Sequence, residues 1–202
     1  MSFRKERKIR VTRNEAYELR AILLSRGMEV LYPPRKIHSL YFDSLNFNMF
    51  MDSEEGVLPR RKVRVRWYNN SSQFTFETKI SSIEGRFKSS RQLPNITSDL
   101  QLRRKKFVDT QYGPLFPSLQ VDYLRYYFRY KSMRITFDEG ISYSDAKVDF
   151  RFCYYDPEQV VEIKTPQTCH EDFIARYLPQ SSARFSKYSR GRLLSLGEIS
   201  EY

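Results

Sequence analysis

The sequence has 202 residues but only two cysteines, two histidines and one tryptophan. Cys153 and Cys169 have neither the spacing of a metal site nor enough partners for a disulfide framework, so we expect a protein of the reducing, cytoplasmic compartment. His38 and His170 stand alone in the sequence, which favours a surface or structural role over catalysis. The scarcity of these residues argues against thiol, zinc and histidine-dependent nucleophilic chemistry.

The chain also lacks long hydrophobic segments. No run approaches the roughly 18 apolar residues that a membrane-spanning helix needs. The first residues, "MSFRKERKIRV", are charged and are not followed by the apolar region of a signal peptide. We find no repeat, low-complexity segment or long linker, and we therefore expect a single domain over residues 1–202 without a transmembrane segment.

Basic and aromatic residues are abundant. Lys and Arg total 35 against 24 Asp and Glu, which gives a formal net charge of +11. Such an excess indicates polyanionic partners, for example polyphosphate, nucleotides, nucleic acid or anionic lipid. The aromatic content of 15% is typical of strands and argues against a disordered basic tail.

The stretch "KVRVRWY" alternates cations with apolar residues. Lys62, Arg64 and Arg66 occupy one face of the predicted strand, and the other face is apolar. Neighbouring like charges on that face are about 7 Å apart and cost on the order of 2 kcal/mol per pair. At least four further strands have one apolar and one charged face, so the pattern is general.

The periodicities predict a mostly β chain. We expect strands at 3–11, 38–44, 61–68, 73–80, 85–92, 119–130, 133–140 and 159–166, with a short strand within 147–155. We expect one helix from a Thr12–Glu15 capping box to Gly27, and others near 44–52, 98–109, 170–178 and 186–196, with a loop at 112–118. Few helices separate the strands, which favours an antiparallel sheet or barrel.

Two arrangements can accommodate the charged faces. In an open sheet they would face solvent, but charges of both signs would then be expected. In a closed barrel they would line a cationic interior suited to a linear anion, with helices covering the apolar outer faces. Three acids, Glu6, Glu77 and Glu162, each stand two residues before a lysine, and their oxygens suit Mg²⁺ or Mn²⁺.

Eight stretches, in order along the chain, resemble the catalytic domain of the vacuolar transporter chaperone (VTC) polyphosphate polymerases, a family of the triphosphate tunnel metalloenzyme (CYTH-like) superfamily. They are "ERKIRV", "SLYFDS", "KVRVRWY", "FETKI", "YLRYYF", "RITFD", "VVEIKTP" and "RFSKYSRG". The resemblance implies an α+β, mostly β fold: an eight-stranded antiparallel tunnel barrel with helices packed outside. It also implies transfer of the γ-phosphoryl group of ATP to a growing polyphosphate chain, with Mn²⁺ or Mg²⁺ as cofactor.

The resemblance also implies roles for individual residues. The catalytic cations would be Arg64, Arg66, Lys79, Arg125, Arg134, Lys164 and Lys187. Lys8, Lys62 and Ser186 would bind phosphate, and Glu162 and Glu6 would be the metal ligands.

The chain departs from the broader superfamily at its start, where Arg4 replaces the first glutamate of E-x-E-x-K. The loss of one carboxylate disfavours a hydrolase or cyclase and is compatible with a polymerase. The regulatory helices and membrane segments of the eukaryotic polymerases are not found, so we expect an excised domain or a short stand-alone member.

Three functions stay open: a polyphosphate polymerase, a hydrolase of triphosphates on the same fold, and a non-catalytic polyanion-binding module. Nucleic acid is not an expected partner, because the aromatic residues lie mostly on strand faces opposite the cations. The "RRKK" run at 103–106 fits a solvated helix face, or an additional polyanion-docking patch. The sequence leaves the oligomeric state open.

Overall fold

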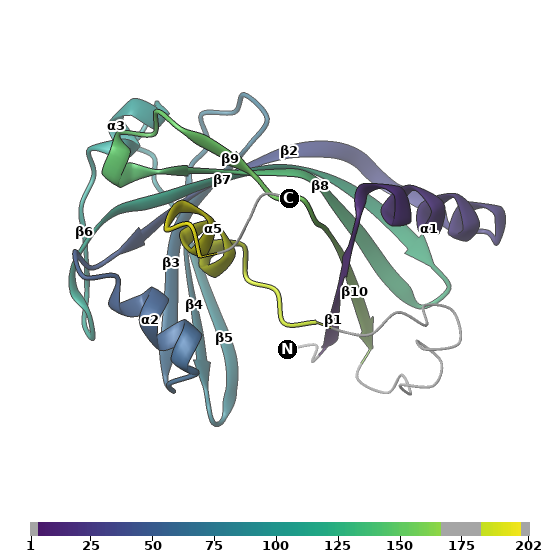
Figure 1. Ribbon diagram of the computed structural model, residues 1–202, viewed down its shortest axis with the longest axis horizontal. Helices are drawn as coiled ribbons and strands as arrows, with labels where there is room; N and C mark the ends of the chain where they lie inside the picture. Colours follow the sequence, from purple (N-terminus) through teal and green to yellow (C-terminus); the bar gives the residue numbers. More distant parts are fainter. Residues whose placement is uncertain (1–3, 167–182, 199–202) are drawn as a thin grey trace. The chain divides into compact units, whose positions relative to one another are not determined.

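The computed structural model describes residues 4–166 and 183–198, and most of them form strands (Figure 1). The strands are β1 (Arg4–Val11), β2 (Glu29–Asp43), β3 (Arg60–Tyr68), β4 (Thr75–Ser82), β5 (Gly85–Gln92), β6 (Phe107–Asp109), β7 (Gly113–Tyr130), β8 (Met133–Asp145), β9 (Cys153–Tyr155) and β10 (Gln159–Pro166). The helices are α1 (Arg13–Ser25), α2 (Asn48–Glu55), α3 (Asp99–Arg103) and α5 (Lys187–Ser195), with a 3-10 turn at Ala146–Val148.

Eight strands follow one another in the hydrogen-bonded order β1-β10-β8-β7-β2-β3-β4-β5, while β6 pairs with β7 and β9 pairs with β8. The ladders of β1 with β10, β10 with β8, β2 with β3, β3 with β4 and β4 with β5 are antiparallel. The predicted α+β, mostly β class with eight antiparallel strands is therefore confirmed.

The chain divides into two compact units. The first unit contains the described residues of 1–35, 123–141 and 156–185, and the second contains those of 36–122, 142–155 and 186–202. Strands β2, β7 and β8 each contribute residues to both units. The predicted assignment of residues 1–202 to one domain stays a prediction.

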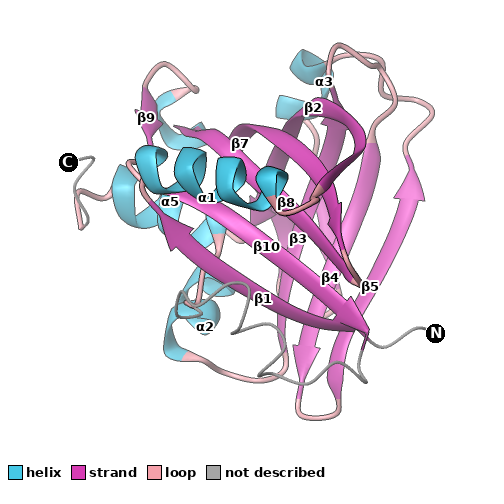
Figure 2. Ribbon diagram, turned by 90° about the vertical axis from the view of Figure 1, so that its right-hand side faces the viewer, coloured by secondary structure: helices cyan, strands magenta, loops and turns pink. Residues whose placement is uncertain are grey.

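In the first unit, α1 packs on the apolar face of β1, β10 and β8 (Figure 2). Ala16, Leu19 and Leu23 of the helix are buried against strand residues. The apolar strand residues are Ile9, Val11, Ile135, Phe137, Val161 and Ile163. Because side chains alternate along a strand, this packing leaves the charged residues of the three strands on the opposite face.

The second unit has its own apolar core on β2 and β3. The strand residues Leu40, Phe42, Val63, Val65 and Trp67 are buried there. Leu102 of α3, Met49 of α2 and Phe107 of β6 cover them. Lys62, Arg64 and Arg66 alternate with these core residues and therefore occupy the other face of β3.

Helix α5 is held in the second unit by close packing at Gly191. A Cβ atom added at Gly191 would lie 2.3 Å from the Tyr143 ring and 2.6 Å from a methyl group of Leu119. The next residue along the helix, the buried Arg192, pairs with Asp145 at 2.5 Å and lies over the Phe47 ring. These contacts fix the position of the helix, and hence of its first residues, within the unit.

The element predictions were confirmed for most strands and wrong in four places. Strands β5 and β10 match their predicted limits, β1, β3, β4 and β8 lie within five residues of theirs, and the Thr12–Glu15 capping box is present. The predicted strand 38–44 begins already at Glu29, and the helix near 44–52 is shifted to 48–55 because Asp43 accepts the amides of Met49 and Phe50 at its start.

The other two errors lie between residues 98 and 118. The helix predicted at 98–109 ends at Arg103, after which Phe107 pairs with Leu115 in β6. The loop predicted at 112–118 is the beginning of β7, whose Gly113 and Pro114 also pair with β6. Tertiary pairing therefore overrides the local turn residues there. The helix predicted at 170–178, Cys169 and His170 lie outside the described residues.

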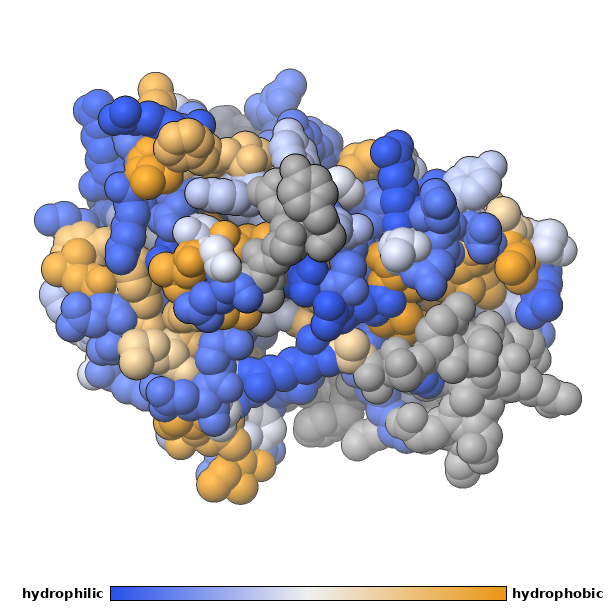
Figure 3. All heavy atoms as spheres, in the orientation of Figure 1, coloured by the Kyte–Doolittle hydropathy of each residue, from blue (hydrophilic) through white to orange (hydrophobic). Residues whose placement is uncertain are grey.

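Apolar side chains are exposed on the β4–β5 hairpin. Figure 3 shows hydrophobic spheres at its tip, where Ile83 is 89% exposed. Ile80 and Phe87 are cross-strand partners on the face opposite Lys79 and Lys88. In the described part of the chain, no helix has the length and apolarity required to cross a membrane.

Replacing Gly191 by alanine should destabilise the protein, because the added methyl group would overlap the buried Tyr143 ring. Overpacking of this kind costs about 2 kcal/mol, and for a chain of this length we expect a decrease in Tm of about 4–8 °C in a thermal denaturation experiment. Leu196→Ala, at a half-exposed position just after the same helix, is the control and should change the Tm little. An unchanged Tm in Gly191→Ala would contradict the packing described.

Candidate functional site

The charged face of the β3–β4–β5 ladder carries three lysines in one row. Lys62 of β3 lies opposite Lys79 of β4, and Lys79 lies opposite Lys88 of β5. Directly opposed residues in antiparallel strands have Cβ atoms about 5 Å apart, and like charges there are destabilising. The row therefore creates a local excess of positive charge that favours binding of an anion.

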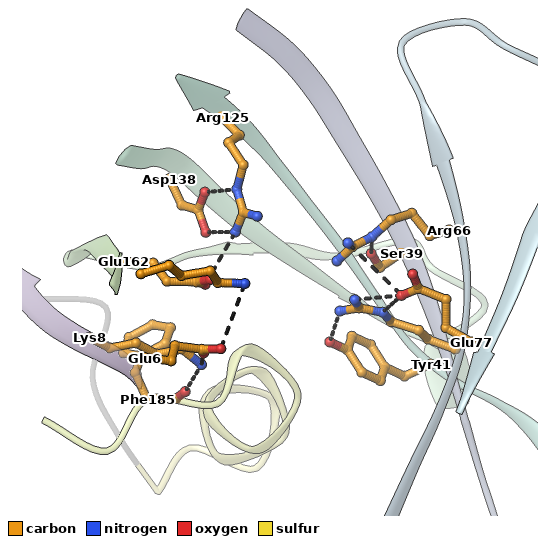
Figure 4. Close-up of polar contacts among 12 residues, drawn as sticks. Glu6, Lys8, Ser39, Tyr41, Arg66, Glu77, Arg125, Asp138, Glu162 and Phe185 are labelled. Carbon is orange, nitrogen blue, oxygen red and sulfur yellow. Dashed lines mark hydrogen bonds and ion pairs between the residues drawn. The ribbon is translucent and has the colours of Figure 1, made fainter. Parts of the chain in front are cut away.

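The neighbouring row of the same ladder contains an acid, Glu77, which partly neutralises Arg64 and Arg66 of β3. Glu77 lies opposite Arg64, and one of its oxygens is 2.6 Å from Arg64 and 4.0 Å from Arg66 (Figure 4). Its other oxygen is 2.5 Å from Lys88. Three cations thus share one carboxylate, and both arginines are buried.

The cations change the protonation of Glu77. Burial alone would raise the pKa of its carboxyl group, but the neighbouring Arg64 and Arg66 and the hydrogen bond from Lys88 lower this pKa to about 2. Glu77 is therefore ionised throughout the physiological range.

Strand β2, which pairs with β3 on the side opposite to β4, also binds the guanidinium groups of Arg64 and Arg66. Arg64 donates to the Tyr41 hydroxyl at 3.0 Å, and Arg66 donates to the Ser39 hydroxyl at 3.3 Å (Figure 4). Tyr41 and Ser39 lie opposite these arginines in the β2–β3 ladder. Burial would raise the pKa of the Tyr41 hydroxyl, but Arg64 and Arg66 outweigh burial and lower it.

Helix α5 reaches the same charged face of the second unit with its first turn. Lys62 donates to the hydroxyl of Ser186, which caps the helix, at 2.6 Å. Tyr188 stacks on the Tyr41 ring with centroids 4.9 Å apart. Its hydroxyl donates to Asp43 at 2.6 Å. The predicted Lys187 is the first residue of this helix, next to Ser186.

The first unit has a second charged face, in which two E-x-K strands run antiparallel. Glu6 lies opposite Lys164, and Lys8 lies opposite Glu162, so acids and lysines alternate across the ladder. The Lys164 ammonium is 2.8 Å from Glu162 and 3.7 Å from Glu6. Lys8 is 3.5 Å from Glu6 and donates to the Phe185 carbonyl at 3.2 Å (Figure 4).

Arg125 is held beside this ladder by Asp138. The two side chains form a bidentate pair at 2.5 and 2.6 Å, and Arg125 is also 3.7 Å from Glu162 (Figure 4). Burial would raise the pKa of Glu162, but Arg125 and Lys164 lower it to about 2. Glu162 is therefore a buried carboxylate that stays charged.

Arg134 extends the charged face along β8. It lies opposite Lys164 in the β8–β10 ladder. Its guanidinium group is 5.7 Å from the centre of the Tyr127 ring. The Nε atom is buried and has no hydrogen-bond acceptor among the described residues.

The carboxylates of the first unit fit a divalent cation that arrives with phosphate. The described residues contain no group of three or more His, Cys, Asp or Glu side chains able to hold a metal ion. Glu6 and Glu162 nevertheless both contact one ammonium group, that of Lys164. Mg²⁺ commonly binds through one or two carboxylates, with phosphate oxygens and water as the other ligands. The two acids match that requirement.

Each unit thus brings together a part of the predicted set. Lys62, Arg64, Arg66, Lys79, Ser186 and Lys187 belong to the second unit, and Glu6, Lys8, Arg125, Arg134, Glu162 and Lys164 belong to the first. Their roles in binding and catalysis remain predictions.

Several residues of these faces were missing from the predicted set. Glu77 and Asp138 carried a usable sequence signal, because each shares a strand face with predicted cations. Tyr41 and Lys88 carried none, since only the ladders bring them to Arg64 and Glu77. His38, which looked isolated, has partners: it contacts Asp122 at 2.5 Å and stacks on Trp67.

Comparisons with known proteins agree on family and fold. The family model described as "VTC domain" matches residues 3–196. No functionally curated protein matches the chain. A proposed adenylate cyclase from Bacillus halodurans has a similar structure, with a TM-score of 0.60, 14% sequence identity, and coverage of 94% of this chain and 97% of that one.

Two other solved structures are similar. One is the proposed adenylyl cyclase HpAC1 from Hippeastrum, which is described as having a dominant triphosphatase activity. Its TM-score is 0.58 at 15% sequence identity, and the alignment covers 94% of this chain and 95% of the HpAC1 chain. The other is a conserved hypothetical protein from Pyrococcus furiosus, with a TM-score of 0.56 at 10% sequence identity. The alignment covers 92% of this chain and 99% of the Pyrococcus chain. At these identities the likeness establishes a shared fold.

The depressed pKa of Glu77 predicts a pH dependence of stability. Because the folded-state pKa of about 2 lies below the ordinary value of 4.5, the stabilisation is present above about pH 4.5 and is lost as the pH falls towards 2. The difference corresponds to about 3 kcal/mol. Glu77→Gln should therefore lower the free energy of unfolding by about 3 kcal/mol at pH 7 and by only about 1 kcal/mol at pH 3, as measured by urea denaturation.

Glu54→Gln, at an exposed position of α2, is the control and should have little effect at either pH. An equal loss at pH 7 and pH 3 in the Glu77 variant would show that the carboxylate charge is not what stabilises this face.

Proposed function

Because the chain belongs to the VTC domain family, we propose that it is a polyphosphate polymerase that transfers the γ-phosphoryl group of ATP to the end of a polyphosphate chain. The observation that carries this proposal is the row of opposed lysines, Lys62, Lys79 and Lys88, beside two buried arginines. An arrangement that destabilises the unliganded protein is explained if a highly charged linear anion binds there.

The cations of the second unit act as the phosphate-binding groups. Arg64 and Arg66 present planar guanidinium groups, which suit the oxygen pairs of a phosphate. Their orientation is fixed by Glu77, Tyr41 and Ser39 before any ligand arrives, so less conformational entropy is lost on binding. Lys62, Lys79 and Lys187 add point charges.

The first unit offers its own set of charged groups to phosphate oxygens. Lys8, Arg125 and Lys164 neutralise charge that spreads over phosphate oxygens during transfer, and Arg134 adds a further cation to the same face. Glu162, ionised and oriented by Arg125 and Lys164, would hold a divalent cation together with Glu6. When bound, Mg²⁺ or Mn²⁺ supplies additional positive charge to the phosphate oxygens.

The reaction needs no strong base. A terminal oxygen of the polyphosphate chain, ionised at neutral pH, forms a bond to the γ-phosphorus of ATP. The bond from that phosphorus to the β,γ-bridging oxygen breaks, and this oxygen leaves as part of ADP. The products are ADP and a chain that is one phosphate longer. The protein therefore contributes positioning and charge, which agrees with the scarcity of His and Cys nucleophiles.

Hydrolysis of triphosphates is the second candidate. It is favoured by the shared fold with HpAC1, the Hippeastrum protein whose dominant activity is described as that of a triphosphatase. The two reactions differ only in whether a phosphate oxygen or water attacks the γ-phosphorus. The third candidate function is polyanion binding without catalysis.

Product analysis distinguishes these functions. We expect the protein, incubated with ATP and Mn²⁺, to produce a ladder of long phosphate chains on a polyacrylamide gel, with one ADP released per phosphate incorporated. ADP with orthophosphate alone would indicate a triphosphatase, and the absence of metal-dependent turnover would indicate a binding module.

The position of Arg66 on its strand provides a matched pair of variants. Arg66→Ala should reduce ATP turnover by at least about 100-fold, because it removes a preorganised cation from the charged face. Arg61→Ala removes an arginine from the other face of β3, where Arg61 pairs with Asp109, and should retain most of the activity. Circular dichroism confirms folding of both variants. Equal activities of the two would contradict the assignment of this face.

A further inference from the structure

An aromatic and arginine cluster lies in the first unit on three neighbouring strands. The strand order β8-β7-β2 brings together Arg134 of β8, Tyr127 of β7, and Tyr32 and Arg35 of β2. The Tyr32 and Tyr127 rings meet edge to face, with centroids 5.9 Å apart. Arg35 lies 5.9 Å from the Tyr32 ring centre and 5.8 Å from that of Tyr127.

The two tyrosines differ in exposure. Tyr127 is 6% exposed, so its ring serves as a support within the protein. Tyr32 is 47% exposed, although its ring is held by both Tyr127 and Arg35. A fixed and half-exposed aromatic ring beside a guanidinium group is a surface on which a planar, electron-rich group can stack.

The cluster is continuous with the charged face of the same unit. Arg134 contacts the Tyr127 ring and lies opposite Lys164. Glu162 is two residues from Lys164 on the same strand face, a step of about 7 Å. Tyr127 shares a face of β7 with Arg125, two residues before it. An extended ligand can therefore contact the aromatic cluster and the Glu162–Lys164 ladder within this unit.

The buried Nε atom of Arg134 indicates where the part of the ligand next to the stacked group would bind. A buried N–H group without an acceptor is costly, and an oxygen atom of a ligand would satisfy it. Arg134 lies between the aromatic cluster on one side and Lys164 on the other. That position suits the sugar or the first phosphate of a nucleotide.

We propose that Tyr32, supported by Tyr127 and Arg35, is a stacking site for the nucleobase of the triphosphate substrate, and that the Nε atom of Arg134 donates to the ribose or the α-phosphate. This inference rests on the proposed use of ATP. Stacking on a tyrosine recognises any base through its π face, so the site discriminates nucleotides from inorganic triphosphate rather than one base from another.

The test compares two ligands that differ only in the nucleoside. Affinities are measured by isothermal titration calorimetry in the presence of Mn²⁺. The two ligands are the β,γ-imido analogue of ATP and imidotriphosphate, whose bridging NH group prevents turnover. Tyr32→Ala should weaken binding of the nucleotide analogue by about 5- to 10-fold, because a stacked base is lost. Binding of imidotriphosphate should change by less than about twofold. Tyr32→Phe, which keeps the ring, should bind both ligands as the unmodified protein does.

Tyr17→Ala is the matched control, because Tyr17 is a 68% exposed tyrosine on α1 of the same unit. It should leave both affinities unchanged. An equal effect of Tyr32→Ala on the two ligands, or no effect on the nucleotide analogue, would overturn the stacking site while leaving the phosphate-binding face intact. If the unmodified protein binds neither ligand, the proposed function fails and the stacking site fails with it.

Discussion

Crowding of like charges on strand faces is the constraint on which both units depend. In the second unit, two buried arginines and three lysines are tolerated because one carboxylate, that of Glu77, contacts three of these cations. A buried charge without a partner costs several kcal/mol, so removal of this acid would affect every cation that it contacts. The positive charge that remains after this pairing is what makes the face suitable for a polyanion.

The first unit solves the same problem by register. Two E-x-K segments that run antiparallel bring each lysine next to an acid, and a shift by one residue would move all four side chains to the apolar face. The packing of α1 on the opposite face fixes that register through Ile9, Val161 and their neighbours. Core packing and the geometry of the charged ladder are therefore two consequences of one strand alignment.

Much of this architecture could be predicted from the sequence, because a period of two separates apolar from charged positions without knowledge of the partners. Glu6, Glu162 and the cation row of β3 were found in that way. The pairing of strands could not be predicted, since contacts such as that of Lys88 with Glu77 depend on which residues lie opposite each other. The early part of β7 was missed for a related reason: its Gly and Pro residues favour a loop, and only the pairing with β6 makes it a strand.

Asp43 links three elements of the second unit. It ends β2, accepts the amides of Met49 and Phe50 at the start of α2, and accepts the hydroxyl of Tyr188 from α5. Burial raises the pKa of this carboxyl group despite these hydrogen bonds. Because one carboxyl group satisfies donors from both helices, α2 and α5 are coupled in local unfolding: opening of either helix leaves the other with a weakened anchor. The first turn of α5, which carries Ser186 and Lys187, thus shares the cooperativity of a helix more than 130 positions away in the sequence.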